Sequence, residues 1–356
     1  KKSIKHFFDS FEKKEVSDLA LKNVGAEKKS LFNPETAFDF HQAYLEGKTS
    51  PVDVVMRFLD IIRSIEESAV PLRPYIAWEE HELMKQANAS AERFSKGKPL
   101  GILDGVPVSV KDELDMLPFK TMIGTRFYSN QPPEQDATSV ARLRSAGALM
   151  VGKTNMHEIG LGVTGLNIHY GTTRNPHHLD HYPGGSSSGS AAAVAAGLSP
   201  IALGCDGGGS IRIPASLCGV VGLKTTWGRI STAGSAPLHW SIGSVGPITS
   251  TARDAAIAYS FLAGPDTRQS CTQEQPNVDL KNFENTNLEG VKLGVFNSWF
   301  NHASEDVVKC CEQMLNSFKS QGAEVKEIEI PHLDEIRVSH AVTITTEMFT
   351  SLKSYL

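Results

Sequence analysis

Lys111, Ser186 and Ser210 are the residues of this chain whose types and settings could hydrolyse an acyl bond. Lys111 ends an alternating valine run at 106–110, which is typical of a half-buried strand, and both serines follow glycines. A serine hydroxyl needs a base to become a nucleophile. A lysine can be that base when it is neutral, a state that burial favours. Since Ser–Lys arrangements are a known alternative to the Ser–His–Asp triad, the three residues predict nucleophilic catalysis.

The three glycines before Ser210 indicate a binding site for negative charge. Gly207, Gly208 and Gly209 follow Asp206 directly. Consecutive glycines cost conformational entropy on folding, and close packing alone explains them poorly. They leave successive backbone N–H groups uncovered, and such a nest can hold a developing oxyanion. We therefore expect the glycine run to lie beside the reacting carbonyl of a substrate.

Another serine, Ser187, occupies the nucleophile position of a G-x-S-x-G match at 185–189. A nucleophile elbow needs a strand that leads into the turn and a helix that leaves it. The alanine-rich run that follows is a good helix former. The preceding segment, however, is rich in proline, histidine and glycine, which predicts a loop. The match therefore gives little support to Ser187 as the nucleophile.

Two further motif matches conflict with their sequence context. Residues 147–154 fit the phosphate-binding pattern G-x-x-x-x-G-K-[ST], but their apolar middle should itself form a strand. Its N–H groups would then be engaged in a sheet. His177, His178 and His181 could share a metal on a regular helix, which the prolines on both sides disfavour. We expect a buried strand and a solvated loop instead.

The elements that must position these residues alternate between helix and strand. Ser50 is a hydroxyl N-cap before Pro51 and predicts the start of a helix. Residues 136–160 predict a helix, a glycine stop and a short strand, and residues 305–331 repeat that order. Such alternation favours an α/β fold with a mostly parallel sheet. The polar, irregular segment 267–287 is the expected long loop or linker.

Composition and charge limit the class of protein. The 356 residues carry a net charge of −5 and are 40% hydrophobic, and no apolar run reaches about 18 residues. A general polyanion binder and a membrane-spanning helix are therefore not expected. Five cysteines without a C-x-x-C favour a reducing compartment.

The first residues of the chain predict an amphipathic helix. Its apolar face is formed by Ile4, Phe7, Phe8 and Phe11. This face could pack on the body of the protein or lie on a membrane surface.

Taken in order, the motifs resemble the amidase signature family. The matching run is GGSSSGSAAAVAAGLSPIALGCDGGGSIRIPASLCGVVGLKTT at 184–226, and GVPVSVKDELD at 105–115 resembles the family's lysine segment. The resemblance implies an α/β amidase signature fold, in which a central mixed, largely parallel twisted sheet is covered by helices on both faces. The domain is expected at 40–356, incomplete at its C-terminus, after an N-terminal helical extension at 1–39.

The resemblance also implies a role for each candidate residue. Ser210 matches the acylated nucleophile, Ser186 matches the bridging serine after a cis peptide bond, and Lys111 matches the base. No metal or cofactor is implied. The expected donors of the oxyanion hole are the backbone N–H groups of Gly207, Gly208, Gly209 and Ser210.

Three further residues are expected to support this site. Arg212, two positions after the expected nucleophile, is expected to tie the glycine loop to an acid such as Asp206. Ser187 is expected to hydrogen-bond in the surroundings of the triad. Ser188, in contrast, is interpreted as a polar residue at the start of a helix.

Within the family, the chain looks most like the plant-type fatty acid amide hydrolases, because of DGGGS at 206–210 and GLKTTWGR at 222–229. This implies cleavage of fatty acid amides such as N-acylethanolamines to free fatty acid and amine. It also implies an intracellular homodimer that binds lipid amides but no nucleic acid, with peripheral contact to the endoplasmic reticulum or other membranes. The alternatives are an amidase of short or aryl amides and a glutamyl-tRNA amidotransferase A-type subunit.

Overall fold

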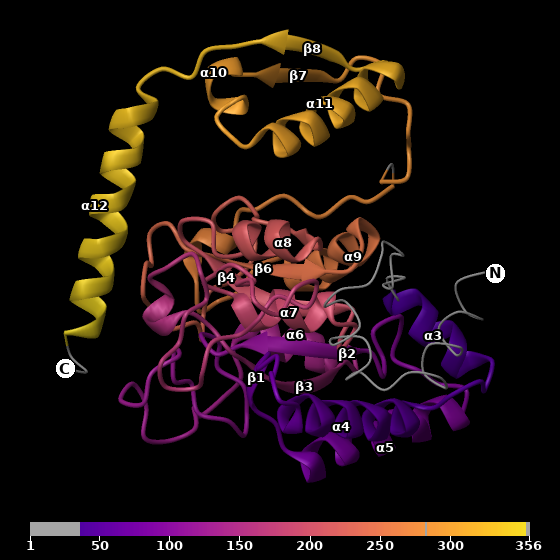
Figure 1. The fold of residues 1–356 in the computed structure, drawn as a ribbon. Helices are drawn as coiled ribbons and strands as arrows, with labels where there is room; N and C mark the ends of the chain where they lie inside the picture. The colour runs from indigo at the N-terminus through magenta and orange to yellow at the C-terminus, as the bar shows by residue number, and fades with distance from the viewer. Residues whose placement is uncertain (1–35, 282, 354–356) are drawn as a thin grey trace. The chain divides into compact units, whose positions relative to one another are not determined.

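The computed structural model describes residues 36–281 and 283–353 (Figure 1). The chain forms two compact units, of which the first extends to Val278 and also includes the segment from Thr346, and the second comprises Asp279–Thr345. All predicted site residues belong to the first unit. The predicted helix around Ile4 to Phe11 lies outside the described residues, so its role and the domain boundary at residue 39 stay predictions.

A mixed sheet forms the centre of the first unit. Its strands are β1 Tyr75–Ala77, β2 Pro107–Lys111, β3 Leu149–Thr154, β4 Ile201–Asp206, β5 Val221–Gly222 and β6 Ser244–Thr249. Their order is β1-β3-β2-β4-β6-β5. β2 is parallel to β3 and β4, whereas β1, β5 and β6 run against their neighbours. The mixed α/β sheet is as predicted, but its parallel pairs are confined to the neighbouring strands β3, β2 and β4, since β1 pairs antiparallel with β3 and β6 pairs antiparallel with β4.

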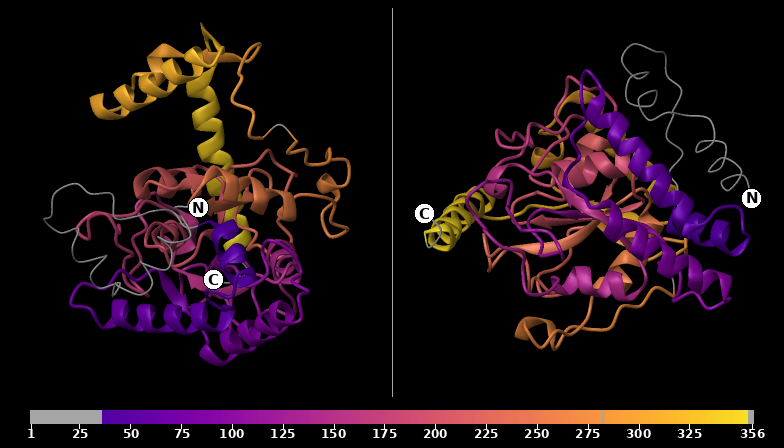
Figure 2. Two further views of the ribbon diagram at one scale, coloured as in Figure 1. Left: turned by 90° about the vertical axis from the view of Figure 1, so that its right-hand side faces the viewer. Right: turned by 90° about the horizontal axis from the view of Figure 1, so that it is seen from below.

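Helices flank this sheet on both faces. In the first unit they are α3 Ala37–Leu45, α4 Pro51–Glu67, α5 Glu80–Ser95, α6 Thr138–Ser145, α7 Ser188–Ala195, α8 Arg212–Cys218 and α9 Ala252–Leu262, with the 3₁₀ helices η1 Glu158–Gly160 and η2 Ser270–Thr272. The start of α4 is confirmed, since the Ser50 side chain accepts the Asp53 N–H and Pro51 lies in the first turn. Figures 1 and 2 show α4 and α5 side by side along the sheet.

The alternation of side chains along β2 decides which of them meet the helix α7. Val108 and Val110 pack in a hydrophobic core with residues of α6 and α9. Because successive side chains of a strand point to opposite faces, Ser109 and Lys111 point to the other face. There α7, whose residues are all buried and mostly alanine, serine or glycine, packs closely on β2 and β4. Lys111 therefore reaches the N-terminal end of α7.

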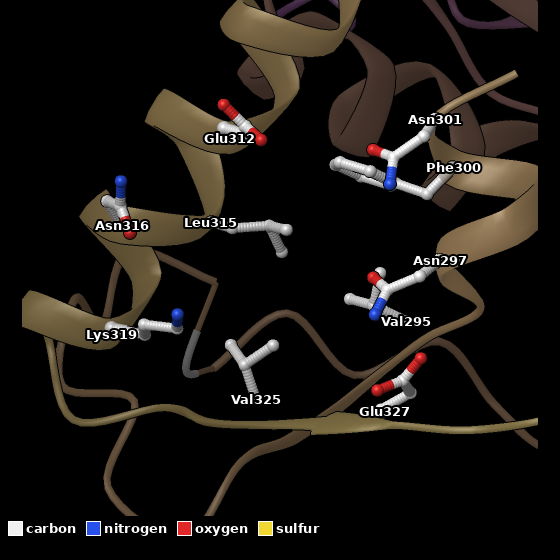
Figure 3. A pocket seen from close by; sticks show the side chains of 10 residues that line it. All are labelled: Val295, Asn297, Phe300, Asn301, Glu312, Leu315, Asn316, Lys319, Val325 and Glu327. Atoms are coloured by element: carbon white, nitrogen blue, oxygen red, sulfur yellow. The ribbon is translucent and has the colours of Figure 1, made fainter.

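The second unit has a small parallel sheet of its own. Its elements are the strands β7 Lys292–Val295 and β8 Glu324–Glu327, the helices α10 Asn297–Phe300 and α11 Glu305–Ser320, and the first part of α12 Leu333–Leu352. The predicted order of helix, stop at Gly322 and strand is confirmed. Figure 3 shows a pocket in this unit, lined by Asn297 and Asn316 among others, which contains no predicted site residue.

None of the described helices is long and apolar enough to cross a bilayer.

Candidate active site

The three expected catalytic side chains come from segments that meet at one edge of the central sheet. Lys111 is the last residue of β2, and Ser210 lies in the turn after β4. Because β2 and β4 are parallel neighbours, their carboxyl ends lie at the same edge, where α/β proteins commonly place their sites. Ser186 precedes α7, which packs on both strands.

Lys111 is fully buried, and its amino group contacts three acceptors. Nζ lies 2.8 Å from Ser186 Oγ, 3.2 Å from the Cys205 carbonyl oxygen and 2.8 Å from Glu113 Oε2. The structure thus places the expected base within hydrogen-bonding distance of the expected bridging serine. Three acceptors match the three N–H donors of a lysine ammonium.

Ser186 is held in place by its backbone. The Gly185–Ser186 peptide bond is cis, as the family resemblance implied. The Ser186 carbonyl accepts the His157 N–H at 3.0 Å. A Cβ on Gly185 would lie 2.8 Å from the Gly165 nitrogen, so that glycine is needed for the close approach of the two backbones. With its backbone held in this way, Ser186 presents its hydroxyl to Lys111.

Ser210 lies partly buried in the turn that joins β4 to α8. Its carbonyl accepts the Ser187 N–H at 3.2 Å, which links the two serine segments. Within residues 36–281 and 283–353, the Ser210 hydroxyl makes no hydrogen bond. The relay contact between Ser186 and Ser210 therefore stays a prediction.

The G-x-S-x-G match has a structural explanation. The residues before Ser187 form a bend rather than a strand, so the strand–turn–helix geometry of a nucleophile elbow is absent. The Ser187 hydroxyl faces the Cys205 carbonyl oxygen at 3.5 Å. Gly189 lies in the first turn of α7, where a Cβ would be 2.2 Å from the Pro74 oxygen and 2.5 Å from the Asn155 nitrogen. The second glycine of the match is therefore required for packing.

Gly189→Ala is expected to lower the free energy of unfolding by about 2 kcal/mol, because both obstructing atoms belong to the backbone. In an unobstructed helix the same change would raise the free energy of unfolding by up to about 1 kcal/mol, so the sign of the change shows whether the position is obstructed. Urea unfolding measures the free energy of unfolding of both proteins. The exposed Ser216→Ala serves as control and is expected within about 0.5 kcal/mol of the wild type. A stabilised Gly189→Ala variant would rule out the close contact.

The Asp206 carboxylate organises the glycine turn. It accepts the Gly209 N–H at 2.7 Å and the Ile211 N–H at 3.0 Å, and the Arg212 guanidinium binds its two oxygens at 3.0 Å each. The structure thus contains the expected pairing of Arg212 with Asp206. Burial alone would raise the pKa of Asp206, but the hydrogen bonds from Arg212 and from the backbone outweigh it and leave that pKa below its ordinary value. The carboxylate is therefore charged at neutral pH.

One of the four predicted oxyanion donors, the Gly209 N–H, already has a hydrogen-bond partner in this structure. The Gly209 N–H points to Asp206, because a buried carboxylate binds the nearest donors of its own turn. The N–H groups of Gly207, Gly208 and Ser210 donate to no other residue in the described part of the chain. Three of the predicted donors are thus left for an oxyanion. A run of glycines does not reveal which way each N–H points.

Two residues of this site, the buried Glu113 and the partly buried His239, were missed in the sequence. Glu113, which is 1% exposed, contacts Lys111. His239 packs against Gly207, where a Cβ would lie 1.6 Å from the His239 Cδ2. Both residues line a small cavity of about 90 Å³. Glu113 lies in the turn after β2, where the Leu114 N–H donates to the Lys111 carbonyl at 3.0 Å, and no local pattern in the sequence marks Glu113 or His239.

The buried strand and the solvated loop that were expected at the two motif matches are confirmed. The phosphate-binding match contains β3, and its Lys153 is buried 3.5 Å from Asp112 Oδ1. His177 and His178 lie in a loop, where the His177 ring contacts the Cys218 carbonyl oxygen at 2.8 Å. Among the described residues, no three His, Cys, Asp or Glu side chains converge as a metal site would need.

Comparison with known proteins supports the motif interpretation. The family model described as Amidase matches residues 59–356. The fatty acid amide hydrolase of Oryza sativa subsp. indica is 41% identical over 324 residues, which are 89% of this chain and 53% of that protein. The glutamyl-tRNA(Gln) amidotransferase A-type subunit of Coxiella burnetii is 36% identical over 90% of this chain and 66% of its own length.

A solved structure with the same fold is that of the peptide amidase from Stenotrophomonas maltophilia. Its TM-score is 0.82 at 28% sequence identity, and the match covers 91% of this chain and 69% of that one. The chain spans about half the length of the plant fatty acid amide hydrolases that it matches. Since the family model covers most of the sequence, from residue 59 to residue 356, the chain belongs to the amidase family, also called the amidase signature family.

Proposed function

We propose that this chain carries the catalytic core of a serine hydrolase that cleaves fatty acid amides, such as N-acylethanolamines, to free fatty acid and amine. The observation that carries this proposal is the 2.8 Å contact between the fully buried Lys111 Nζ and Ser186 Oγ, in a segment linked by hydrogen bond to that of Ser210. The substrate class is supported by the plant relatives, which are named fatty acid amide hydrolases.

The proposed mechanism is a proton relay. Neutral Lys111 accepts the proton of Ser186, which accepts that of Ser210, and Ser210 Oγ attacks the amide carbonyl. The N–H groups of Gly207, Gly208 and Ser210 stabilise the oxyanion, at roughly 3 kcal/mol for each strong donor. The proton then returns through Ser186 to the leaving amine, which departs poorly when unprotonated. Water hydrolyses the acyl-enzyme, and the scheme uses no metal or cofactor.

The supporting residues act on the shape of the turn. Asp206 and Arg212 hold the glycine turn through their ion pair and the hydrogen bond to Gly209. The Ser187 N–H holds the Ser210 carbonyl. Homodimer formation and peripheral membrane contact stay predictions that derive from the family resemblance.

A second candidate function is that of a glutamyl-tRNA amidotransferase A-type subunit, which the Coxiella burnetii relative favours. An amidase of short or aryl amides would use the same relay. Hydrolysis measured over a series of acyl chain lengths separates the fatty-amide function from the short-amide one. We expect activity to peak with long acyl chains, and a peak at short chains would contradict the fatty-amide assignment.

Labelling with a fluorophosphonate probe followed by peptide mapping tests the nucleophile. We expect the adduct on Ser210, because its hydroxyl lies on the only segment that combines a glycine nest with a partly buried serine among the described residues. The Ser210→Ala variant should not label, and the exposed Ser216→Ala should label like the wild type. An adduct on Ser187 would revive the elbow interpretation, and a folded protein that does not label would contradict the proposal.

A further inference from the structure

Paired with the Glu113 carboxylate as an ammonium, the Lys111 amino group would donate to three oxygens, those of Ser186, Cys205 and Glu113. As a neutral amine it would keep two N–H donors and could accept the Ser186 O–H, so the contacts permit both states. In the proposed function, Lys111 must accept a proton from Ser186, and it can do so only after it has lost one. The structure therefore raises the question of which group receives that first proton.

Glu113 is the acceptor within reach. Its Oε2 lies 2.8 Å from Lys111 Nζ, and its other oxygen, Oε1, is buried without a hydrogen-bond partner among the described residues. The carboxylate is 1% exposed and lines the cavity of about 90 Å³ that also contacts Cys205, Ser235 and His239. The Cys205 thiol also interacts with this carboxylate, but a thiol is a weak donor. A buried carboxylate with an unsatisfied oxygen is costly as an anion, and protonation relieves that cost.

The other titratable groups that face Glu113 do not compete with Lys111 for this role. Burial, and then the charge of Glu113, raises the pKa of the Cys205 thiol, which stays protonated at neutral pH. Burial is also the main cause that lowers the pKa of His239, and its imidazole is therefore neutral at pH 7. Within the described part of the chain, Lys111 is thus the cation in direct contact with Glu113.

We propose that Glu113 is the proton partner of Lys111: the pair shares one proton, and its transfer to the carboxylate leaves a neutral amine facing Ser186. This inference rests on the proposed function. Glu113 is a positioning residue that acts through Lys111 and does not touch the substrate.

The transfer balances within the pair. One N–H bond of Lys111 breaks, the O–H bond forms on Glu113 Oε2, and the lone pair left on Nζ accepts the proton of Ser186. The pair has no net charge before or after the transfer. Loss of the same proton to solvent would leave the Glu113 carboxylate buried without a counter-ion, which is a strongly unfavourable state.

The pH profile of Glu113→Gln tests this inference, because glutamine keeps the size of the side chain but cannot take the proton. In the wild type, activity fails at low pH only when a second proton enters the pair. In the variant, Lys111 must release its own proton to solvent, which requires a higher pH. We expect the acid limb of kcat/KM to move upward by about one pH unit or more, and kcat/KM at pH 7 to fall about 100-fold.

The conservative variant Glu113→Asp is the matched control, since a shorter carboxyl group can still take the proton. We expect its acid limb within about half a pH unit of the wild type, at reduced kcat/KM. If Glu113→Gln does not fold, Glu113→Asp tests the inference by itself. An upward shift of its acid limb by about one pH unit or more then overturns the inference. Thermal unfolding of each variant shows which of them are folded.

The direction of the shift separates the inference from its alternative. If Glu113 only holds Lys111 in the charged state, its removal makes the neutral lysine easier to form. The acid limb would then move to lower pH, or stay in place, and either result overturns the inference. Failure of the proposed function has a different signature, which is a wild-type protein that does not label on Ser210 or a Lys111→Met variant that keeps its activity.

Discussion

Lys111→Met will lower kcat/KM for amide hydrolysis by about 10⁴-fold, because the change removes the base of the proposed relay. Methionine keeps much of the length and apolar volume of the lysine stem, so the fully buried space next to Ser186 remains filled. Steady-state kinetics with a long-chain fatty acid amide measures the effect. Lys98→Met, the same change at an exposed lysine, should leave kcat/KM unchanged.

The same variant will also lose stability, which must be separated from its loss of activity. Without Lys111, the carboxylate of Glu113 is buried without its partner, and this costs about 3–5 kcal/mol of unfolding free energy. The double variant Lys111→Met/Glu113→Gln removes the unpaired charge, so it should regain most of the stability and stay inactive. A Lys111→Met variant that keeps more than a tenth of the activity would place the base elsewhere.

Asp206→Asn is expected to lower kcat/KM by about 100-fold, the scale of losing one oxyanion donor. Asparagine has one acceptor oxygen where the carboxylate has two, so the Gly209 and Ile211 N–H groups and Arg212 cannot all keep their partner. The glycine turn should therefore lose its fixed conformation. We expect a loss of about 2 kcal/mol in unfolding free energy, from the buried groups left unsatisfied.

The pH dependence of stability identifies this loss as electrostatic. Because the pKa of Asp206 is lowered in the folded state, its contribution is fully present above the unfolded pKa, which is about 3.9 for an aspartate, and is lost as the pH falls through the folded value. The wild type should therefore lose more stability below about pH 4 than Asp206→Asn does. Asp180→Asn is the control, since that side chain is 80% exposed and should change stability little. Parallel acid curves for the wild type and Asp206→Asn would contradict this role.

The local elements were predictable because their signals are local. Ser50 and Pro51 mark the start of α4 by capping chemistry, which involves only neighbouring residues. The strand β3 was predictable within a phosphate-binding match, because four apolar residues in a row suit a buried strand better than a loop. In contrast, the antiparallel pairing of β6 with β4 joins segments far apart in the chain, and no local pattern signals it.

For the candidate site, the sequence by itself determined which residues could do the chemistry and in which local settings they lie. Lys111 at a strand end, Ser186 after two glycines and Ser210 after three are local patterns, and they also carried the family resemblance. Only the tertiary structure decided that Glu113 is buried against Lys111 and that Gly209 donates to Asp206. The physical reason is that burial and hydrogen-bond direction depend on packing between distant segments, such as the Lys111 contact with Cys205, which lies 94 positions away in sequence.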